Sequence, residues 1–198
     1  MERKLILFVK NPEFGKVKTR LAKTIGKEKA LDVYQSLIRY TKKIAEPLSV
    51  EKEVWYSNFI ENKDIWDEAG FQKRLQRGND LGNRMSFALS QSVTNGGSKR
   101  VVIIGSDCAE LDTDTIESAF DLLEKYSLVV GPAKDGGYYL IGMNQFYPEL
   151  FEEIEWSTEN VLEQTLSKAK TAEISYFLLK ELNDVDTKED WVLVKDKL

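Results

Sequence analysis

The sequence predicts an α/β fold with a largely parallel central sheet. The apolar runs Leu5–Val9 and Arg100–Gly105 are continuous rather than alternating, which is typical of strands buried on both faces. Between them, Lys27–Ile44 carries its apolar residues at helical spacing. Segments of strand type and helix type alternate along the 198 residues, without a linker or a repeat. We therefore expect one domain that spans residues 1–198.

The expected elements follow one another in a regular order. The first half contains a strand at 5–9, a helix at 27–44, a strand at 53–57, a short helix at 64–69, a short strand at 71–76, a helix at 80–93 and a turn at 95–98. The second half contains a strand at 100–105, a helix at 114–125, strands at 128–132 and 138–143, and helices at 158–169 and 188–197. We expect Ser157 or Thr158 to cap the helix at 158–169, and Thr187 to start the last helix.

Two of these helices have a predicted inward face. The helix at 27–44 ends before Pro47, and its expected buried residues are Ala30, Val33, Tyr34, Leu37, Ile38, Thr41 and Ile44. The expected buried residues of the helix at 80–93 are Leu81, Met85, Ala88 and Leu89.

Composition narrows the possible chemistry. The formal net charge of −5 argues against general nucleic-acid binding, which usually needs a basic face. The chain has no histidine, which excludes histidine-based triads and histidine-ligated zinc. Its single cysteine, Cys108, excludes an intramolecular disulfide and fits a reducing cytoplasm. No apolar run is long enough to cross a bilayer, so a soluble cytoplasmic protein is expected. Chemistry must use carboxylates, Lys, Arg or a metal held by oxygen.

A basic loop follows the first strand directly, with the sequence K-N-P-E-F-G-K-V-K-T-R-L at 10–21. Gly15 lets the backbone approach an anion closely, and Arg20 can bind phosphate through two hydrogen bonds. The other positive charges come from Lys10, Lys16 and Lys18. The G-K-[ST] ending of a P-loop is absent. The loop is therefore either a phosphate-binding loop or a solvated connection between strand and helix.

Asp107 lies where the strand at 100–105 ends, within G-S-D-C-A. Its carboxylate would project into a cleft and could hold Mg²⁺ or Mn²⁺ against a diphosphate. One aspartate binds such a metal weakly, so a second ligand or substrate phosphates must share it. The alternative is that Asp107 caps the next turn. Without a histidine to activate it, Cys108 is interpreted as a small buried residue.

Three further segments could contribute to a site. In the run 131–142, Asp135 could accept hydrogen bonds from a sugar or acceptor hydroxyl, although a β-hairpin turn also explains the D-G-G sequence. In 76–85, a glycine-containing loop opens a helix and could direct free backbone N–H groups at a base or phosphate. Arg77 and Arg84 add charge there, while capping by Asn79 or Asp80 explains much of the same pattern. Near the end, the helix start at Thr187 leaves Asp184 and Asp186 unexplained.

Taken together, these five segments resemble the bacterial glycosyltransferase-like family called selenodomain-associated transferase 1, of the DUF2064 type. The motifs that carry the resemblance are K-x-P-x-x-G-x-V-K-T-R-L, Q-x-G-x-D-L-G-x-R-M, G-S-D-C, G-P-A-x-D-G-G-Y-Y-L-I-G and D-V-D-T-x-E-D. The family implies the GT-A fold, also called the nucleotide-diphospho-sugar transferase fold. More distant similarity runs to nucleotidyltransferases of molybdenum-cofactor, deazaflavin-cofactor and sugar-acid activation. Two positions depart from the usual pattern, because Ala109 and Lys188 stand where proline is usual.

The resemblance implies roles for individual residues. The nucleotide and its phosphates would be bound by Lys10, Gly15, Lys18, Arg20, Gln76, Gly78, Asp80, Gly82 and Arg84. Asp107 stands in for the metal aspartate of a D-x-D motif, and Asp186 corresponds to a second metal aspartate in related nucleotidyltransferases. The catalytic residues would be Asp107 and Asp135. The acceptor side would include Gly136, Gly137 and Tyr138.

The resemblance also implies an activity. We expect a Mg²⁺- or Mn²⁺-dependent transferase, first a glycosyltransferase that moves a sugar from a nucleotide sugar to a small-molecule acceptor. One alternative is a nucleotidyltransferase that uses a nucleoside triphosphate and releases pyrophosphate. A second alternative is a non-catalytic nucleotide-binding protein. No role in nucleic-acid binding is expected.

Overall fold

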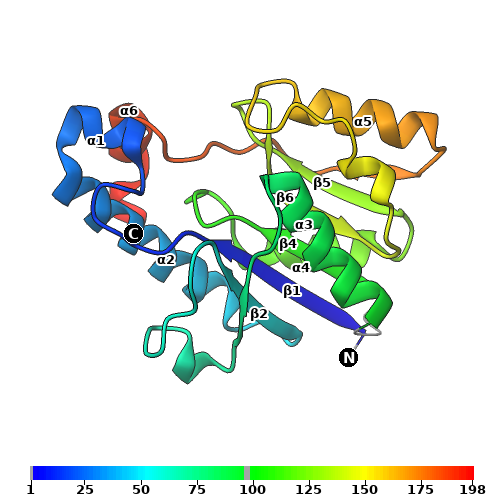
Figure 1. Ribbon diagram of the computed structural model, residues 1–198, viewed down its shortest axis with the longest axis horizontal. Coiled ribbons are helices and arrows are strands. Elements are labelled where there is room, and N and C mark those ends of the chain that lie inside the picture. Colours follow the sequence, from blue (N-terminus) through cyan, green and yellow to red (C-terminus); the bar gives the residue numbers. More distant parts are fainter. Residues whose placement is uncertain (1, 96–98) are drawn as a thin grey trace.

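Seven strands form one sheet in the computed structural model, which describes residues 2–95 and 99–198 (Figure 1). The strands are β1 (Arg3–Val9), β2 (Glu51–Tyr56), β3 (Gln72–Leu75), β4 (Arg100–Ile104), β5 (Leu128–Pro132), β6 (Tyr138–Met143) and β7 (Tyr176–Leu178). Their order across the sheet is β3-β2-β1-β4-β6-β5-β7. Neighbouring strands are parallel, except that β6 runs antiparallel to both β4 and β5. The predicted α/β fold with a largely parallel sheet is confirmed.

Helices cover both faces of this sheet. They are α1 (Thr19–Ile25), α2 (Lys27–Ala45), α3 (Leu81–Ser90), α4 (Thr113–Leu122), α5 (Val161–Thr171) and α6 (Lys188–Val194). Helices α2 and α4 contribute to the core on one face of the sheet, whereas α3 and α5 contribute to the core on the other face. Helices α1 and α6 lie beside each other at one end of the molecule, next to the start of α2 (Figure 1).

The central strand β1 accounts for the two-sided core. Leu5, Leu7 and Val9 face the core under α2 and α4, while Ile6 and Phe8 face the core under α3. All five are buried, so both faces of the strand are removed from water. This double burial explains why the sequence of the strand is continuously apolar. A third, smaller cluster joins α1, α2 and α6 and includes Leu21, Val33, Leu37, Val185 and Val194.

Strand β6 runs antiparallel to its neighbours because a short hairpin joins it to β5. Only five residues connect Pro132 to Tyr138, too few for the crossover that parallel neighbours need. The hairpin interpretation of the D-G-G run is therefore confirmed. The helix predicted at 27–44 is also confirmed, and all seven of its predicted inward residues are buried.

Several sequence-based expectations need correction. The pattern did not predict α1 or β7, and the helix expected at 64–69 is a 3-10 turn at Asp67–Ala69. Leu81 was expected to face inward, but it is 45% exposed because α3 begins at this residue. Residues 96–98 of the predicted turn at 95–98 lie outside the described residues.

The start of α5 also differs from the prediction. The helix begins at Val161, and its N-cap residue Asn160 makes no side-chain capping hydrogen bond. Thr158 does not cap the helix, because its hydroxyl donates to the carbonyl of Glu155 instead. By contrast, Thr187 does start α6, where it forms a capping box with Asp190. Across the described part of the chain, we find no helix with the length and apolar character needed to span a membrane.

Candidate active site

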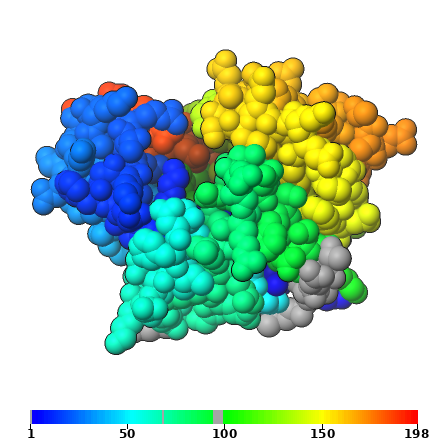
Figure 2. Space-filling view, in the orientation of Figure 1, coloured from blue at the N-terminus to red at the C-terminus, as the bar shows by residue number. Residues whose placement is uncertain are grey.

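A cleft opens where β1 and β4 end and β6 begins. Its volume is about 440 Å³, and a smaller hollow of about 230 Å³ shares its walls. In Figure 2 the cleft is the hollow between the lobe formed by the first helices (blue) and the segment around residues 150–160 (yellow). The predicted site residues that line it are Lys10, Arg20, Gln76, Asp107, Asp135, Gly137, Tyr138 and Asp186. Ligands bind at this edge in open α/β sheets.

Two basic side chains and two aspartates meet at the wall of this cleft. Arg20, Asp107 and Asp186 line it, whereas the buried Lys18 contacts the two aspartates without lining the cleft itself. The ammonium nitrogen of Lys18 lies 2.8 Å from Oδ1 of Asp107 and 3.6 Å from Oδ1 of Asp186. The guanidinium of Arg20 lies 2.8 Å from Oδ2 of Asp186. The Lys18 side chain is 3% exposed, whereas that of Arg20 is 71% exposed. The structure thus brings together four residues from three segments that are far apart in the sequence, and Asp107 does not serve as a cap.

Local backbone geometry at the end of the basic loop turns the side chain of Lys18 toward the aspartates. Lys18 is the N-cap of α1 and adopts a left-handed conformation, with φ 47° and ψ 46°. This conformation costs a non-glycine residue on the order of 1 kcal/mol. The neighbouring Val17 is buried, and the carbonyl of Lys18 accepts the first hydrogen bond of α1 from the N–H of Ala22. The strained turn lets Val17 reach the core and Lys18 reach the aspartates, while Arg20 stays at the mouth of the cleft.

The segment Asp184–Val185–Asp186 explains why two carboxylates besides that of Asp107 line the cleft. Val185 is fully buried against α1 and α2, and its N–H donates to the carbonyl of Asp107 at 2.9 Å. Asp184 and Asp186, on either side of Val185, both line the cleft. Alternation in extended backbone puts residues i and i+2 on one side, so the buried valine directs both aspartates the same way.

Asp184 is an acidic residue of the cleft for which the sequence predicts no function. Burial raises the pKa of its carboxyl to about 7, with the Asp107 carboxylate as the next cause and Lys18 acting in the opposite direction. Raised pKa values of this kind are common in functional clefts. The pattern D-V-D ahead of a capped helix contained the signal, because the apolar residue between two acids predicts that both acids share one side.

The donor set of the cleft suits a hard divalent cation. The carboxylate oxygens of Asp107 and Asp186 both contact the Lys18 ammonium, so positive charge already balances this pair of carboxylates. Oδ1 of Asp107 and Nζ of Lys18 are both buried, and the 2.8 Å contact between them is not aligned as a hydrogen bond. Within residues 2–95 and 99–198, no three acidic, cysteine or histidine side chains form a complete metal shell. Phosphate oxygens and water would have to complete one, as is usual for Mg²⁺.

Tyr34 anchors the start of the basic loop. This buried residue of α2 donates its hydroxyl to the carbonyl of Lys10 at 3.0 Å and accepts the N–H of Lys10 at 2.7 Å. The hydroxyl also lies 3.2 Å from Oγ of Ser106, the residue before Asp107. Burial raises the pKa of Tyr34, and the nearby Asp107 carboxylate raises it further. The phenol therefore stays protonated and holds the loop against the end of β4.

Asn11 joins the basic loop to the loop after β2. This residue is 2% exposed, and sequence reasoning did not single it out. Its Nδ2 donates to the carbonyl of Phe59 at 2.9 Å, and its Oδ1 accepts the N–H of Asn58 at 3.0 Å. Its own N–H donates to Oγ of Ser57 at 3.3 Å. One buried amide thus satisfies several backbone groups of a neighbouring loop and fixes the chain directly after Lys10, a residue that lines the cleft.

We expect Asn11→Ala to lower the free energy of unfolding by about 2 kcal/mol, because it leaves buried backbone groups without partners. Urea denaturation measures this change. Asn58→Ala is the matched control, since the exposed Asn58 side chain makes one hydrogen bond, to Glu13, and should change stability by less than about 0.5 kcal/mol. Equal stability of the two variants would contradict the role given to Asn11.

The segment 76–85 mainly holds the sheet edge together. Nε2 of Gln76 donates to the carbonyls of Val9 and Trp55, which ties the ends of β1 and β2. Arg84 donates to the carbonyl of Gly78 at 3.2 Å. Asp80 accepts the N–H of Asn83 at 2.7 Å and is the N-cap of α3. Of the five residues predicted to bind nucleotide in this segment, only Gln76 lines the cleft.

Three of the predicted glycines meet other parts of the protein. Gly82 packs against the indole of Trp156, and a Cβ on Gly82 would overlap that ring. Gly136 packs against the backbone of Glu159, and Gly15, with φ 71°, packs near the side chain of Lys27. Like Gly78, Asp80 and Arg84, these glycines do not line the cleft. Their predicted contacts with nucleotide or acceptor remain expectations.

The opposite wall of the cleft contains Asp135 and aromatic side chains. Asp135 is exposed, and its Oδ1 accepts the N–H of Gly137 at 3.0 Å, while Oδ2 has no hydrogen-bond partner among the described residues. Tyr138 and Trp156 also line this side, together with the exposed Leu81. This wall therefore offers one carboxylate beside an apolar surface, in contrast to the charged wall formed by Arg20, Asp107 and Asp186.

Cys108 is buried beside the cleft, as predicted, and is not suited to act as a nucleophile. Burial raises the pKa of its thiol to about 12, and Asp184 contributes to the rise. At pH 8 we expect the native thiol to react with Ellman's reagent at least about 100-fold more slowly than the unfolded protein, because little thiolate forms. Absorbance kinetics with and without guanidinium chloride test this expectation. Equally fast labelling of the native protein would show an accessible, ionised Cys108.

The strand order with one antiparallel strand, the basic loop after β1 and the aspartate after β4 define a protein of the nucleotide-diphospho-sugar transferase fold class. The chain belongs to the family described as "Uncharacterized protein conserved in bacteria (DUF2064)", whose model matches residues 40–158. The crystal structure of a "putative nucleotide-diphospho-sugar transferase" from Desulfovibrio desulfuricans G20 is 34% identical in sequence, with a TM-score of 0.85. The match covers 94% of this chain and 83% of that chain.

Two more distant structures share the fold. The inositol-1-phosphate CTP transferase from T. maritima is 16% identical, with a TM-score of 0.61, and the match covers 96% of this chain and 91% of that chain. Rv0371c from Mycobacterium tuberculosis H37Rv, in complex with manganese, is 10% identical, with a TM-score of 0.60 and full coverage of both chains. No curated protein matches the sequence.

Proposed function

We propose that this protein is a divalent-metal-dependent glycosyltransferase that takes a sugar from a nucleotide sugar and gives it to a small-molecule acceptor. The observation that carries the proposal is that Arg20 and the buried Lys18 pair with Asp107 and Asp186, the two carboxylates on one wall of the cleft. In the ligand-free protein these charges neutralise one another. A metal diphosphate offers the same balance, because its anionic oxygens can replace the carboxylates as partners of the two basic side chains.

Asp107 and Asp186 are the residues that would hold Mg²⁺ or Mn²⁺. When bound, such an ion supplies positive charge that stabilises the departing diphosphate. The protein's own contribution comes from the basic loop. Lys18 is fixed by burial, and Arg20 at the mouth can turn its exposed guanidinium to bind two phosphate oxygens. Tyr34 and Asn11 hold this loop in place, so little reorganisation is needed when the donor binds.

The acceptor side is assigned to the wall around Asp135. The free Oδ2 of this carboxylate can accept a hydrogen bond, and then a proton, from an acceptor hydroxyl. Tyr138 and Trp156 give the same wall an apolar surface, on which the face of a sugar ring can pack. The donor phosphates would then lie on the charged wall and the reacting hydroxyl on the opposite one. The 34% identical relative, named for nucleotide-diphospho-sugar transfer, supports this reaction class.

Nucleotidyl transfer is the second candidate, favoured by the number of basic groups on the donor wall. Lys10, Lys18 and Arg20 together suit the charge of a triphosphate better than that of a diphosphate. The shared fold supports it as well, since one protein of this fold is an inositol-1-phosphate CTP transferase. In this reaction the acceptor oxygen would attack the α-phosphate, and pyrophosphate would leave.

The released product separates these reactions. The protein is incubated with panels of nucleotide sugars and nucleoside triphosphates, with Mg²⁺ or Mn²⁺, and with pooled small-molecule acceptors. Release of a nucleoside diphosphate together with a glycosylated acceptor supports glycosyl transfer, whereas pyrophosphate release identifies nucleotidyl transfer. Loss of product in EDTA tests the metal requirement. Nucleotide binding without any product would instead favour a non-catalytic nucleotide-binding protein.

A further inference from the structure

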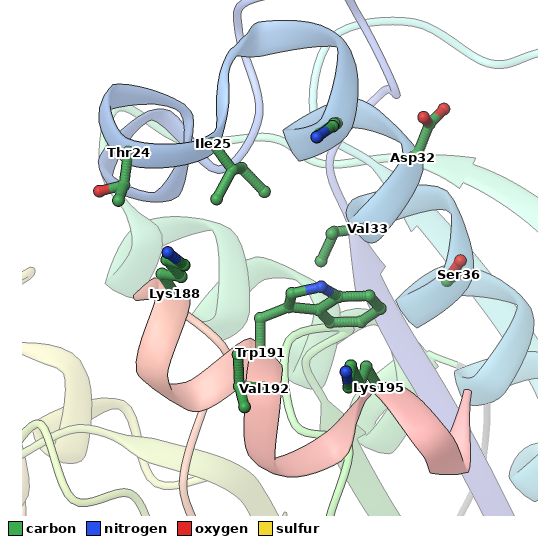
Figure 3. A pocket seen from close by; sticks show the side chains of 10 residues that line it. Thr24, Ile25, Asp32, Val33, Ser36, Lys188, Trp191, Val192 and Lys195 are labelled. Carbon is green, nitrogen blue, oxygen red and sulfur yellow. The ribbon is translucent and has the colours of Figure 1, made fainter.

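A second groove lies between α1, α2 and α6 and shares no lining residue with the aspartate cleft (Figure 3). Its volume is about 530 Å³, within the usual range of small-molecule sites. Each of the three helices contributes side chains to its lining. The residues that line it are Thr24 and Ile25 from α1, Lys29, Asp32, Val33 and Ser36 from α2, Lys188, Trp191 and Val192 from α6, and Lys195 from the 3-10 turn after α6.

The floor of the groove is apolar and has an aromatic centre. The indole ring of Trp191 extends from α6 toward Val33 on α2, and Ile25 lies on the α1 side (Figure 3). Val192 is 51% exposed beside it. The neighbouring Leu193 is 78% exposed. A partly exposed tryptophan between apolar side chains offers a flat surface on which a planar group can stack.

Basic side chains surround this floor. Lys188 at the start of α6 and Lys195 just after its end lie on either side of Trp191 (Figure 3). Lys29 of α2 lines the same groove. In the part of the chain that the structure describes, none of these three lysines forms an ion pair. The one acidic lining residue, Asp32, points its carboxylate away from Trp191 (Figure 3). A chain with a net charge of −5 therefore keeps a local positive site over an apolar surface.

We propose that this groove binds a small organic anion with a flat apolar body, such as an aromatic carboxylate, sulfonate or phosphate. The ring would stack on Trp191, and the acidic group would pair with Lys188, Lys195 or Lys29. Lys188 starts α6 and Lys195 begins the 3-10 turn that follows it, seven residues later, a span of roughly 10 Å at 1.5 Å per helical residue. This length matches two fused or linked rings better than an extended peptide, so the geometry points to a small molecule.

A ligand in this groove would contact α1 and α6, the two helices that adjoin the charged residues of the active site. Helix α1 begins directly after Lys18 and carries Arg20, and α6 begins two residues after Asp186. A ligand in the groove would touch α1, α2 and α6 together and restrain them against one another. The binding site itself does not depend on the proposed transferase activity, since it uses none of the same residues.

Anilinonaphthalene sulfonate is a suitable probe, because it combines fused aromatic rings with one permanent negative charge. Fluorescence titration of the full chain should give one saturable site. The double variant Lys188→Gln/Lys195→Gln should weaken binding at least about 10-fold through the lost charge attraction. The matched control is Lys125→Gln/Lys170→Gln, which removes two exposed lysines elsewhere and should keep the wild-type affinity.

A second variant tests the apolar floor without altering the core. Val192→Glu places a carboxylate in the groove at a side chain that is half exposed, so the fold should be retained, and probe binding should be lost. Circular dichroism confirms folding of each variant. Wild-type affinity for the probe in Val192→Glu, or equal affinity in the two lysine double variants, would overturn the proposal.

Discussion

Replacing Asp107 with asparagine is expected to lower the metal-dependent turnover by at least about 100-fold. The substitution keeps the shape of the side chain but removes the negative charge that lies 2.8 Å from Lys18. A neutral amide binds Mg²⁺ weakly, and Lys18 would then pair with Asp186 alone, the other proposed metal ligand. Both effects act against a bound metal diphosphate. Isothermal titration with a nucleotide, in the presence and absence of Mg²⁺, should show the same affinity in both conditions for this variant.

The fold of the Asp107→Asn variant has to be checked separately, because Lys18 is buried and loses its nearest partner. Circular dichroism and thermal unfolding provide that check. Asp121→Asn, an exposed residue on α4, serves as the matched control and should retain full turnover. If folded Asp107→Asn still binds nucleotide more tightly with Mg²⁺ than without it, Asp107 is not a metal ligand.

A second consequence of the same geometry concerns the two basic side chains. Lys18→Ala with Arg20→Ala should weaken the binding of a nucleoside diphosphate at least about 10-fold more than that of the free nucleoside, since both side chains are assigned to phosphate. Parallel titrations with the two ligands measure the difference. An equal loss for both ligands would mean that the loop acts only by supporting the fold.

The sequence predicted the sheet well because its strands follow from local rules. Continuous apolar runs indicated β1 and β4. Parallel strands end at one edge of a sheet, which is why the loops that carry Lys18 and Asp107 lie side by side. The resemblance added Asp186. The sequence pattern predicts no function for Asp184, because its raised pKa is a result of burial. That burial depends on how Val185 packs against α1 and α2, which lie far away in the sequence.

Other features depend on tertiary contacts that spacing cannot reveal. Gly82 was assigned to the nucleotide, yet the space beside it is filled by Trp156, a residue 74 positions later in the sequence. Asn11 was passed over because a single asparagine in a loop gives no pattern, although it connects two loops through buried hydrogen bonds. Helix α1 was missed because it is short and because Gly26, with φ 90°, separates it from α2.

Gly136→Ala is expected to lower the free energy of unfolding by about 3 kcal/mol. Gly136 has φ 86°, which a side chain rarely adopts, and a Cβ there would overlap the carbonyl group of Glu159. Backbone cannot swing aside as a flexible side chain does, and the carbonyl of Gly136 also accepts the N–H of Leu162 at 2.9 Å. The hairpin must therefore shift, and Asp135 with it. Chemical denaturation gives the loss of stability.

The neighbouring Gly137 provides the control for this prediction. It does not have a positive φ, and a Cβ there would meet only Oδ1 of Asp135, at 3.3 Å. Gly137→Ala should therefore cost less than about 1 kcal/mol. Because Asp135 sits on the same turn, any Gly136→Ala protein that remains folded should also lose turnover, with the larger change in kcat, since the donor wall is untouched. Comparable stability of the two alanine variants would mean that the hairpin can shift at this contact without loss of stability. The close packing of Gly136 on Glu159 would then not be what positions Asp135.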